Sequence, residues 1–280
     1  ATFNNCTTLN RVAVVATVDT IPIIATTNPD PICFPLTHDI TVTSNIVLAN
    51  STITYSYWKD VNATQPISTP KAIPVSGTYY IKAADTYNCY DIKSVSVVVN
   101  PLPAKPVIQN IFYCQNDVVS NLSAQVLQLH TLKWYDQNAS GGIASANGAI
   151  PITTIPGVQN FYVSQVNDAT SCESPRAMIE VTTYALPVIT ITSSSNPICY
   201  ADNVTLLASG AVSYLWDKAV INNQPFQITE SARYTVIGTD VNGCKNTNYI
   251  DQVVVPLPIV KPLIGNLTIC NGSSLNLLNS

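Results

Sequence analysis

Hydrophobic residues along this chain occur in short runs that alternate with polar residues and are rich in β-branched side chains. Clear examples are VSVVV at 95–99, IEVTT at 179–183 and VTLLA at 204–208. Alternation with a period of two is typical of half-buried strands, and no window of eleven residues shows the period of an amphipathic helix. The pattern therefore predicts an all-β fold.

The strand-like runs belong to a unit that repeats along the chain. Each copy has a first cysteine, then a tryptophan, then a tyrosine ten residues before a second cysteine and an aspartate four residues before it. The first cysteines are Cys33, Cys114, Cys199 and Cys270, and the second cysteines are Cys6, Cys89, Cys172 and Cys244. The tryptophans are Trp58, Trp134 and Trp216, the tyrosines Tyr79, Tyr162 and Tyr234, and the aspartates Asp85, Asp168 and Asp240.

The repeat divides the chain into five pieces. We expect the C-terminal part of a truncated repeat at 1–20, complete repeats at 21–100, 101–185 and 186–256, and the N-terminal part of a truncated repeat at 257–280. About seven short strands fit into each ~80-residue copy, which is typical of an immunoglobulin-like (Ig-like) β-sandwich. The junctions are rich in proline and contain no Gly/Ser linker, so they should be short and stiff. The sequence therefore predicts a fragment of tandem Ig-like sandwiches that form an elongated rod.

The recurring aromatic and acidic residues have structural interpretations. The tryptophans are expected to fill the core on the third strand of each repeat, and the tyrosines to begin the sixth strand with the hydroxyl bonded to backbone. The aspartates lie in turns, where their side chains bond the neighbouring backbone. The alternatives are sugar stacking for the tryptophans, a ligand role for the tyrosines, and calcium binding for the aspartates. A calcium site typically needs six or more converging oxygens.

The eight cysteines include no C-x-x-C pair, which argues against a zinc ribbon, and their regular placement favours disulfides in an oxidising compartment. Pairing within repeats would join Cys33 to Cys89, Cys114 to Cys172 and Cys199 to Cys244. A strand of about 20 Å separates the two cysteines of one repeat, whereas bonded cysteines have Cα atoms within about 7 Å. Pairing between neighbouring repeats, Cys33 to Cys172 and Cys114 to Cys244, avoids this difficulty. Free thiols are a third alternative, and all three remain open.

Composition and motifs argue against several other functions. Only 10% of residues are charged, the net charge is −4, and lysines and arginines are not clustered, which argues against nucleic-acid binding. No apolar run approaches the ~18 residues that span a bilayer. The two histidines, His38 and His130, accompany no nucleophile, zinc or phosphate-binding motif. We therefore expect a protein that is not an enzyme and has no cofactor and no metal site.

Two stretches of the last complete repeat resemble a known group of proteins. RYTVIGTDVNGC at 233–244 and ICYADNVTLLASGAVSYLWDK at 198–218 are similar to the Ig-like and PKD-like repeats of large Bacteroidetes surface proteins. The best-known members are gliding-motility adhesins of the SprB type, which are exported by the type IX secretion system. The motif marks a type of repeat rather than an activity.

The resemblance implies a stalk or adhesive fibre that is extracellular and attached to the outer membrane. The implied partners are neighbouring repeats of the same chain, surface glycans or a substratum, and the outer-membrane secretion and anchoring machinery. Two alternatives remain at this stage. The chain is a glycan- or calcium-binding Ig-like module, or it is an accessory region of a secreted hydrolase.

Overall fold

The protein is nearly all β-structure, as predicted. The computed structural model describes residues 2–4, 6–7, 13–16, 18–49, 52–259 and 271, and its regular elements are strands apart from one short 3-10 helix, η1 (Ile40–Val42). Among these residues no helix has the length and apolar character needed to cross a membrane. The first two strands, β1 (Thr2–Phe3) and β2 (Cys6–Thr7), pair with each other.

By its packing the chain forms two compact units. The first comprises residues 1–111, 120–151 and 159–181, and the second comprises residues 112–119, 152–158 and 182–280. The strands are most easily followed in the three segments that the sequence repeat defines: 21–100, 101–185 and 186–256.

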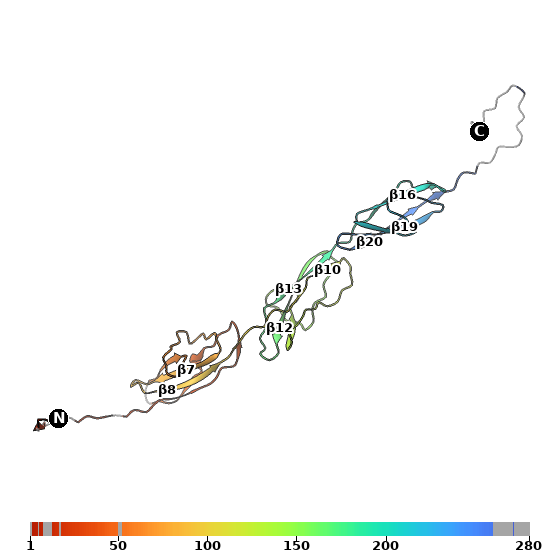
Figure 1. Cartoon of the computed structure of the whole chain (residues 1–280). Helices are drawn as coiled ribbons and strands as arrows, with labels where there is room; N and C mark the ends of the chain where they lie inside the picture. Colours follow the sequence, from red (N-terminus) through yellow and green to blue (C-terminus); the bar gives the residue numbers. More distant parts are fainter. Residues whose placement is uncertain are drawn as a thin grey trace. The chain divides into compact units, whose positions relative to one another are not determined.

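The described residues of segment 21–100 contain seven strands in three pairing groups. Strands β6 (Thr54–Trp58), β7 (Gly77–Ala84) and β8 (Tyr90–Val97) form an antiparallel sheet (Figure 1). Strand β3 (Ile23–Thr26) pairs antiparallel with β5 (Ser44–Leu48), and β4 (Ile32–Cys33) pairs parallel with β9 (Val99–Asn100). Because side chains alternate along a strand, Ile81 and Ala83 of β7 and Val95 and Val97 of β8 are buried on one face of the sheet. The buried cluster consists of Ile24, Ile40, Ile73, Ile81, Ala83, Val95 and Val97.

Segment 101–185 is organised around a four-stranded sheet. Its strand order is β10 (Ile111–Cys114), β13 (Ala177–Tyr184), β12 (Gly157–Asn167) and β11 (His130–Trp134). Alternate residues of β12 and β13 are again buried, namely Phe161, Val163, Ile179 and Val181.

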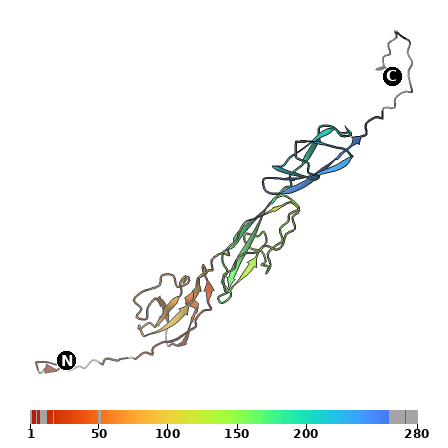
Figure 2. The ribbon, with the colours of Figure 1, turned by 45° about the vertical axis from the view of Figure 1, so that its right-hand side comes forward.

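Segment 186–256, drawn in teal and blue in Figure 2, has three pairing groups like those of segment 21–100, with β18 as an additional strand in one of them. One sheet contains β14 (Thr190–Ser193), β16 (Asn203–Ser209) and β18 (Pro225–Gln227), and the other contains β17 (Ser213–Trp216), β19 (Ala232–Thr239) and β20 (Lys245–Gln252). Strand β15 (Ile198–Cys199) pairs parallel with β21 (Val254–Val255). The buried cluster consists of Ile189, Ile198, Val204, Leu206, Ala208, Trp216, Val220, Ile228, Tyr234 and Val236.

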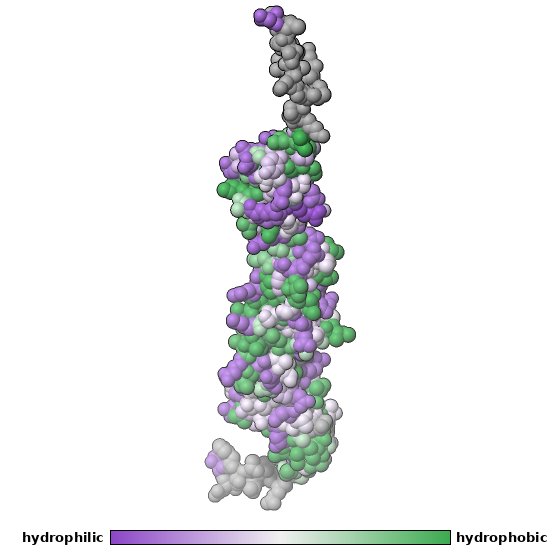
Figure 3. All heavy atoms as spheres, turned by 90° about the vertical axis from the view of Figure 1, so that its right-hand side faces the viewer, coloured by the Kyte–Doolittle hydropathy of each residue, from purple (hydrophilic) through white to green (hydrophobic). Residues whose placement is uncertain are grey.

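In segment 186–256 the backbone of β19 lies close to the Ile189 side chain at Gly238. A Cβ atom placed on Gly238 of β19 would lie 2.2 Å from Cδ1 of Ile189. Any larger residue at this position would therefore require the Ile189 side chain to move. Toward solvent, hydrophobic and hydrophilic residues are interspersed on the face that Figure 3 shows.

Candidate functional site: the disulfide-bonded turns

Two disulfides join cysteines that are far apart in the sequence. Cys33 is bonded to Cys172 and Cys114 to Cys244, with sequence separations of 139 and 130 residues and Cα–Cα distances of 5.6 and 5.5 Å. Each bond joins the first cysteine of one predicted repeat to the second cysteine of the next. The alternative of pairing within repeats is wrong for these four cysteines.

Two of the other cysteines carry free thiols. Cys89 is a half-buried free thiol and Cys199 an exposed one. The side chain of Cys6 and all of Cys270 lie outside the described residues.

Among the described residues, three first cysteines lie beside the strand by which the chain leaves their segment. We call Cys33, Cys114 and Cys199 the exit cysteines. The residue after each of them donates its backbone N–H to that last strand: Phe34 to Asn100 O (2.9 Å), Gln115 to Tyr184 O (2.8 Å) and Tyr200 to Val255 O (2.9 Å). In each case the acceptor is followed two residues later by Leu-Pro, at Leu102, Leu186 and Leu257. The exit cysteine is therefore held within a few residues of the junction to the following segment.

Three second cysteines close a tight turn between the two longest described strands of their segment. We call Cys89, Cys172 and Cys244 the entry cysteines. Their carbonyl oxygens accept the backbone N–H of Asp85 (3.0 Å), Asn167 (3.0 Å) and Asp240 (2.9 Å), respectively. Oδ1 of Asp240 also accepts the N–H groups of Asn242 (2.9 Å) and Cys244 (2.8 Å). Oδ1 of Asp85 accepts those of Tyr87 (2.8 Å) and Cys89 (2.9 Å) in the same way.

These turns lie near the point where the chain enters the segment. Just beyond Cys244, the Asn246 amide donates to Pro187 O (2.9 Å). In segment 101–185 the amide of Gln165 donates to Ala104 O (2.8 Å). Gln165 is also bonded to Ser174, which lies two residues beyond Cys172. The Gln165 N–H donates to Ser174 Oγ (3.1 Å), and the Ser174 N–H donates to Gln165 O (2.9 Å). Exit and entry cysteines therefore approach the same short proline junction from opposite sides, which explains how a disulfide can span it.

The turn of the middle segment corrects one sequence assignment. Asn167 and Cys172 are five residues apart, whereas Asp85–Cys89 and Asp240–Cys244 are four apart. Asn167 therefore takes the place of the aspartates, and its Oδ1 accepts the N–H groups of Ala169 and Thr170 (both 3.0 Å). Asp168, which the spacing singled out, is exposed and accepts the Thr131 hydroxyl (2.8 Å) instead.

The same extra residue shifts the tyrosine of the middle segment. Tyr234 is buried in its core, and Tyr79 is half-buried, with its hydroxyl donating to Val75 O (2.9 Å). In segment 101–185 the core position belongs to Phe161, which is 4% exposed, while Tyr162 is half-buried on the opposite face. Counting ten residues back from Cys172 selects the wrong neighbour because the turn is one residue longer.

The tryptophans do not occupy one common position. Trp134 and Trp216 are buried and lie opposite buried valines, Val163 and Val236. Trp58 is half-buried and lies opposite Tyr80, and its Nε1–H donates to Ser56 Oγ (2.9 Å). Its neighbour Tyr57 lies opposite buried Ile81 and packs against the core.

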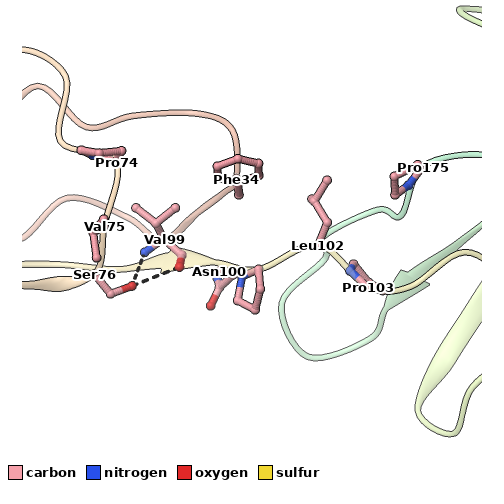
Figure 4. A pocket seen from close by; sticks show the side chains of 10 residues that line it. Phe34, Pro74, Val75, Ser76, Val99, Asn100, Leu102, Pro103 and Pro175 are labelled. Atoms are coloured by element: carbon pink, nitrogen blue, oxygen red, sulfur yellow. Dashed lines mark hydrogen bonds between the residues drawn. The ribbon is translucent and has the colours of Figure 1, made fainter.

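An apolar cavity of about 510 Å³ is lined by residues from both sides of the Leu102-Pro103 junction (Figure 4). Phe34 and Pro175, close to the two bonded cysteines, line it together with Leu102 and Pro103 of the junction. On its far side Ser76 Oγ donates to Val99 O (3.0 Å) and accepts the Val99 N–H (2.8 Å). The lining has no ionisable side chain, so it has no group for acid–base or metal chemistry. Across the described residues, no three His, Cys, Asp or Glu side chains are grouped for a metal ion.

The sequence of the middle segment matches a known domain family. Residues 103–184 match the family model described as "Ig-like domain CHU_C associated". This segment is an Ig-like domain. It holds one exit cysteine, Cys114, and one entry cysteine, Cys172, so the disulfides connect an Ig-like domain to the segments on both sides of it.

Three solved structures that match most of the chain are distant in sequence. No curated protein sequence matches it. The I67–I69 fragment of the titin I-band is 10% identical over 85% of this chain and all of that chain, with a TM-score of 0.37. The D1–D4 fragment of ICAM-5 is 11% identical over 83% of this chain and 76% of that one (TM-score 0.34). SGBP-B of the Bacteroides ovatus mixed-linkage glucan utilisation locus is 16% identical over 86% and 72% (TM-score 0.24). No property of those proteins follows for this chain.

Proposed function

We propose that this chain is a load-bearing part of a secreted surface fibre, in which consecutive Ig-like units are covalently joined across their junctions. The observation that supports the proposal is the pairing of each bonded exit cysteine with the entry cysteine of the next segment. Segments 21–100, 101–185 and 186–256 are then three units of an extended stalk. Disulfides of this kind persist in oxidising compartments, which fits an extracellular location.

The two bonds overlap along the sequence, and this gives the stalk a mechanical property. The loop from Cys33 to Cys172 and the loop from Cys114 to Cys244 share residues 114–172. When the chain ends are pulled, the shortest covalent path from Cys33 to Cys244 crosses both disulfides and follows only the shared stretch, about 58 residues (172 − 114). Without the bonds the path is about 211 residues (244 − 33). With both disulfides intact, most residues of the three segments therefore cannot be extended by the pulling force, even after the segments unfold.

Single-molecule force spectroscopy tests this proposal directly. At ~3.4 Å per extended residue, reduction should lengthen the fully unfolded chain by about 500 Å. The chain is pulled from its two ends with and without a reductant. The Cys33→Ser, Cys114→Ser double variant is the matched control, because it should give the longer value under both conditions. Equal contour lengths for the oxidised and reduced natural chain would overturn the proposal.

The similarity to Bacteroidetes adhesin repeats extends the proposal to the role of the fibre. We assign the stalk to a cell-surface adhesin that is attached to the outer membrane, exported by type IX secretion and engaged in attachment or gliding on surface glycans or a substratum. Protease treatment of intact cells that produce the protein tests this location. Digestion of the chain without lysis is the expected result, and protection until lysis contradicts it.

A further inference from the structure

The free cysteine of segment 186–256 has the same backbone setting as the two bonded exit cysteines. Cys199 lies on β15, which pairs parallel with β21, just as Cys33 lies on β4, which pairs parallel with β9. Its carbonyl accepts the N–H of the residue three positions on, Asp202 (3.2 Å), as do the carbonyls of Cys33 and Cys114. The following junction, Leu257-Pro258, also matches Leu102-Pro103.

The free cysteine of segment 21–100 has the setting of the two bonded entry cysteines. The turn from Asp85 to Cys89 has the same length and the same side-chain acceptor as the turn from Asp240 to Cys244. Two residues beyond the cysteine, Asp91 Oδ2 accepts the N–H of Ile24 on the opening strand (3.2 Å). The chain enters this segment through Ile21-Pro22, which corresponds to Leu186-Pro187.

The environment of these thiols differs from that of their bonded counterparts in one consistent way. Bonded Cys172 and Cys244 are both 0% exposed, whereas Cys89 is only half-buried. Bonded Cys33 and Cys114 are half-buried, whereas Cys199 is exposed. Beside Cys89, Asp85 is 8% exposed, and its Oδ2 is buried without a hydrogen-bond partner among the described residues. Each free cysteine is therefore more exposed to solvent than the bonded cysteines of the same type.

The thiol of Cys89 is also unsuited to nucleophilic chemistry. Burial raises its pKa, and the neighbouring carboxylate of Asp85 raises it further. A reactive cysteine has a lowered pKa instead, because the thiolate is the nucleophile. The raised pKa therefore argues against a catalytic role for Cys89.

We propose that Cys199 and Cys89 are the attachment points of two further junction disulfides, Cys199 with the entry cysteine of a following Ig-like unit and Cys89 with the exit cysteine of a preceding one. This inference rests on the proposed function, because it extends the same linkage to additional units. In each case two S–H bonds break, one S–S bond forms, and two protons and two electrons are released. A disulfide oxidant, either a thiol–disulfide oxidoreductase or oxidised glutathione, takes up both and is reduced to two thiols.

The test duplicates one segment within the full chain. A copy of residues 188–258 is inserted after Pro258, so that a second unit follows Cys199 across an unchanged Leu-Pro junction. The copy carries Cys199→Ser, so that the original Cys199 is the one whose linkage is followed. It also carries Lys245→Arg, which gives the tryptic peptide with the entry cysteine of the copy a distinct mass. After refolding in a glutathione redox buffer, thiols are alkylated and the disulfides are mapped without reduction.

We expect Cys199 to be linked to the entry cysteine of the copy, and its alkylation to fall from nearly complete in the natural chain to nearly none. A matched insertion with Cys244→Ser in the copy should leave Cys199 fully alkylated. If Cys199 stays free while Cys33–Cys172 and Cys114–Cys244 form, the further inference fails and the proposed function stands. If Cys33–Cys172 and Cys114–Cys244 do not form, the proposed function fails and the inference fails with it.

A second insertion tests the other attachment point with a different segment. A copy of residues 103–185 placed between Thr20 and Ile21 puts an exit cysteine ahead of Cys89. Linkage of Cys89 to that exit cysteine is expected, and a free Cys89 next to an intact Cys33–Cys172 bond would overturn the assignment.

Discussion

Segments 21–100 and 186–256 share a three-stranded antiparallel sheet, a parallel strand pair and the order of their cysteines and aromatic residues, but they build their cores from different side chains. In segment 186–256 the core includes Trp216 and Tyr234. In segment 21–100 no tryptophan belongs to the buried cluster, and Tyr55 and Tyr57 pack against it instead. Side chains alternate between the two faces of a strand, so a shift of one residue moves Trp58 out of the core. The same order of residues in two repeats therefore does not ensure that the residues occupy equivalent positions in the sheets.

The largest expected difference in the free energy of unfolding is between alanine variants of the tryptophans in these two segments. Trp216→Ala should lower the free energy of unfolding by about 3–5 kcal/mol, because it leaves a large cavity in the core. Trp58→Ala should cost less than about 1.5 kcal/mol, because its side chain is half-exposed. Urea unfolding of the full chain, followed by circular dichroism, measures both variants. Equal losses would mean that the two tryptophans occupy equivalent positions after all.

A neighbouring pair in the middle segment sharpens the same point. Phe161→Ala should destabilise the protein by about 3 kcal/mol, since Phe161 is buried. Tyr162→Ala should cost roughly 1 kcal/mol, because it removes a half-buried side chain from the other face. Thermal unfolding of the two variants provides the comparison. A larger loss for Tyr162→Ala would restore the assignment that simple counting from Cys172 suggests.

A smaller loss of stability is expected when the side-chain acceptor of an entry-cysteine turn is removed. Asp240→Ala removes the acceptor of two backbone N–H groups and should cost about 1–2 kcal/mol. Asp168→Ala is the matched control and should cost about 0.5 kcal/mol or less, because Asp168 is exposed and does not cap its turn. Chemical denaturation of both variants under oxidising conditions measures the difference. Similar losses would contradict the assignment of Asn167, rather than Asp168, as the turn residue.

The smallest effect is a pH dependence next to a bonded entry cysteine. Burial acts to raise the pKa of Glu173, but hydrogen bonds from Ser164 and Tyr135 and the charge of Lys133 outweigh it, and the pKa is lowered. A carboxylate with a lowered folded-state pKa contributes stability above its unfolded pKa of about 4.3, and this is lost as the pH falls through the folded value.

The melting temperature of the natural chain should therefore decrease below about pH 4.3. Glu173→Gln should be less stable than the natural chain at pH 7, and the difference between the two should shrink on acidification. A difference that does not change between pH 7 and pH 3 would show that the charge of Glu173 contributes nothing.

Much of the candidate site could be read from the sequence, but its connections could not. The cysteines, the turns before the entry cysteines and the proline junctions are all visible as local patterns. The choice between pairing within and between segments depends on which ends of the strands lie near each junction, and that is a property of the folded sheets. Asn167 was missed because asparagine replaces aspartate in a longer turn. Alignment on the hydrophobic alternation of β12, rather than on Cys172, would have found both Asn167 and Phe161.

By itself the sequence determined the all-β character, the repeat, the two types of cysteine and the sites of the turns, because these depend on side-chain alternation and on residues close together in the chain. Only the tertiary structure decided which aromatic residue of each pair enters the core and which cysteines bond. Strand register determines the face of every side chain, and a single additional turn residue changes it. A disulfide requires two Cα atoms within about 7 Å of each other, and for residues more than a hundred positions apart only the packed strands can bring them that close.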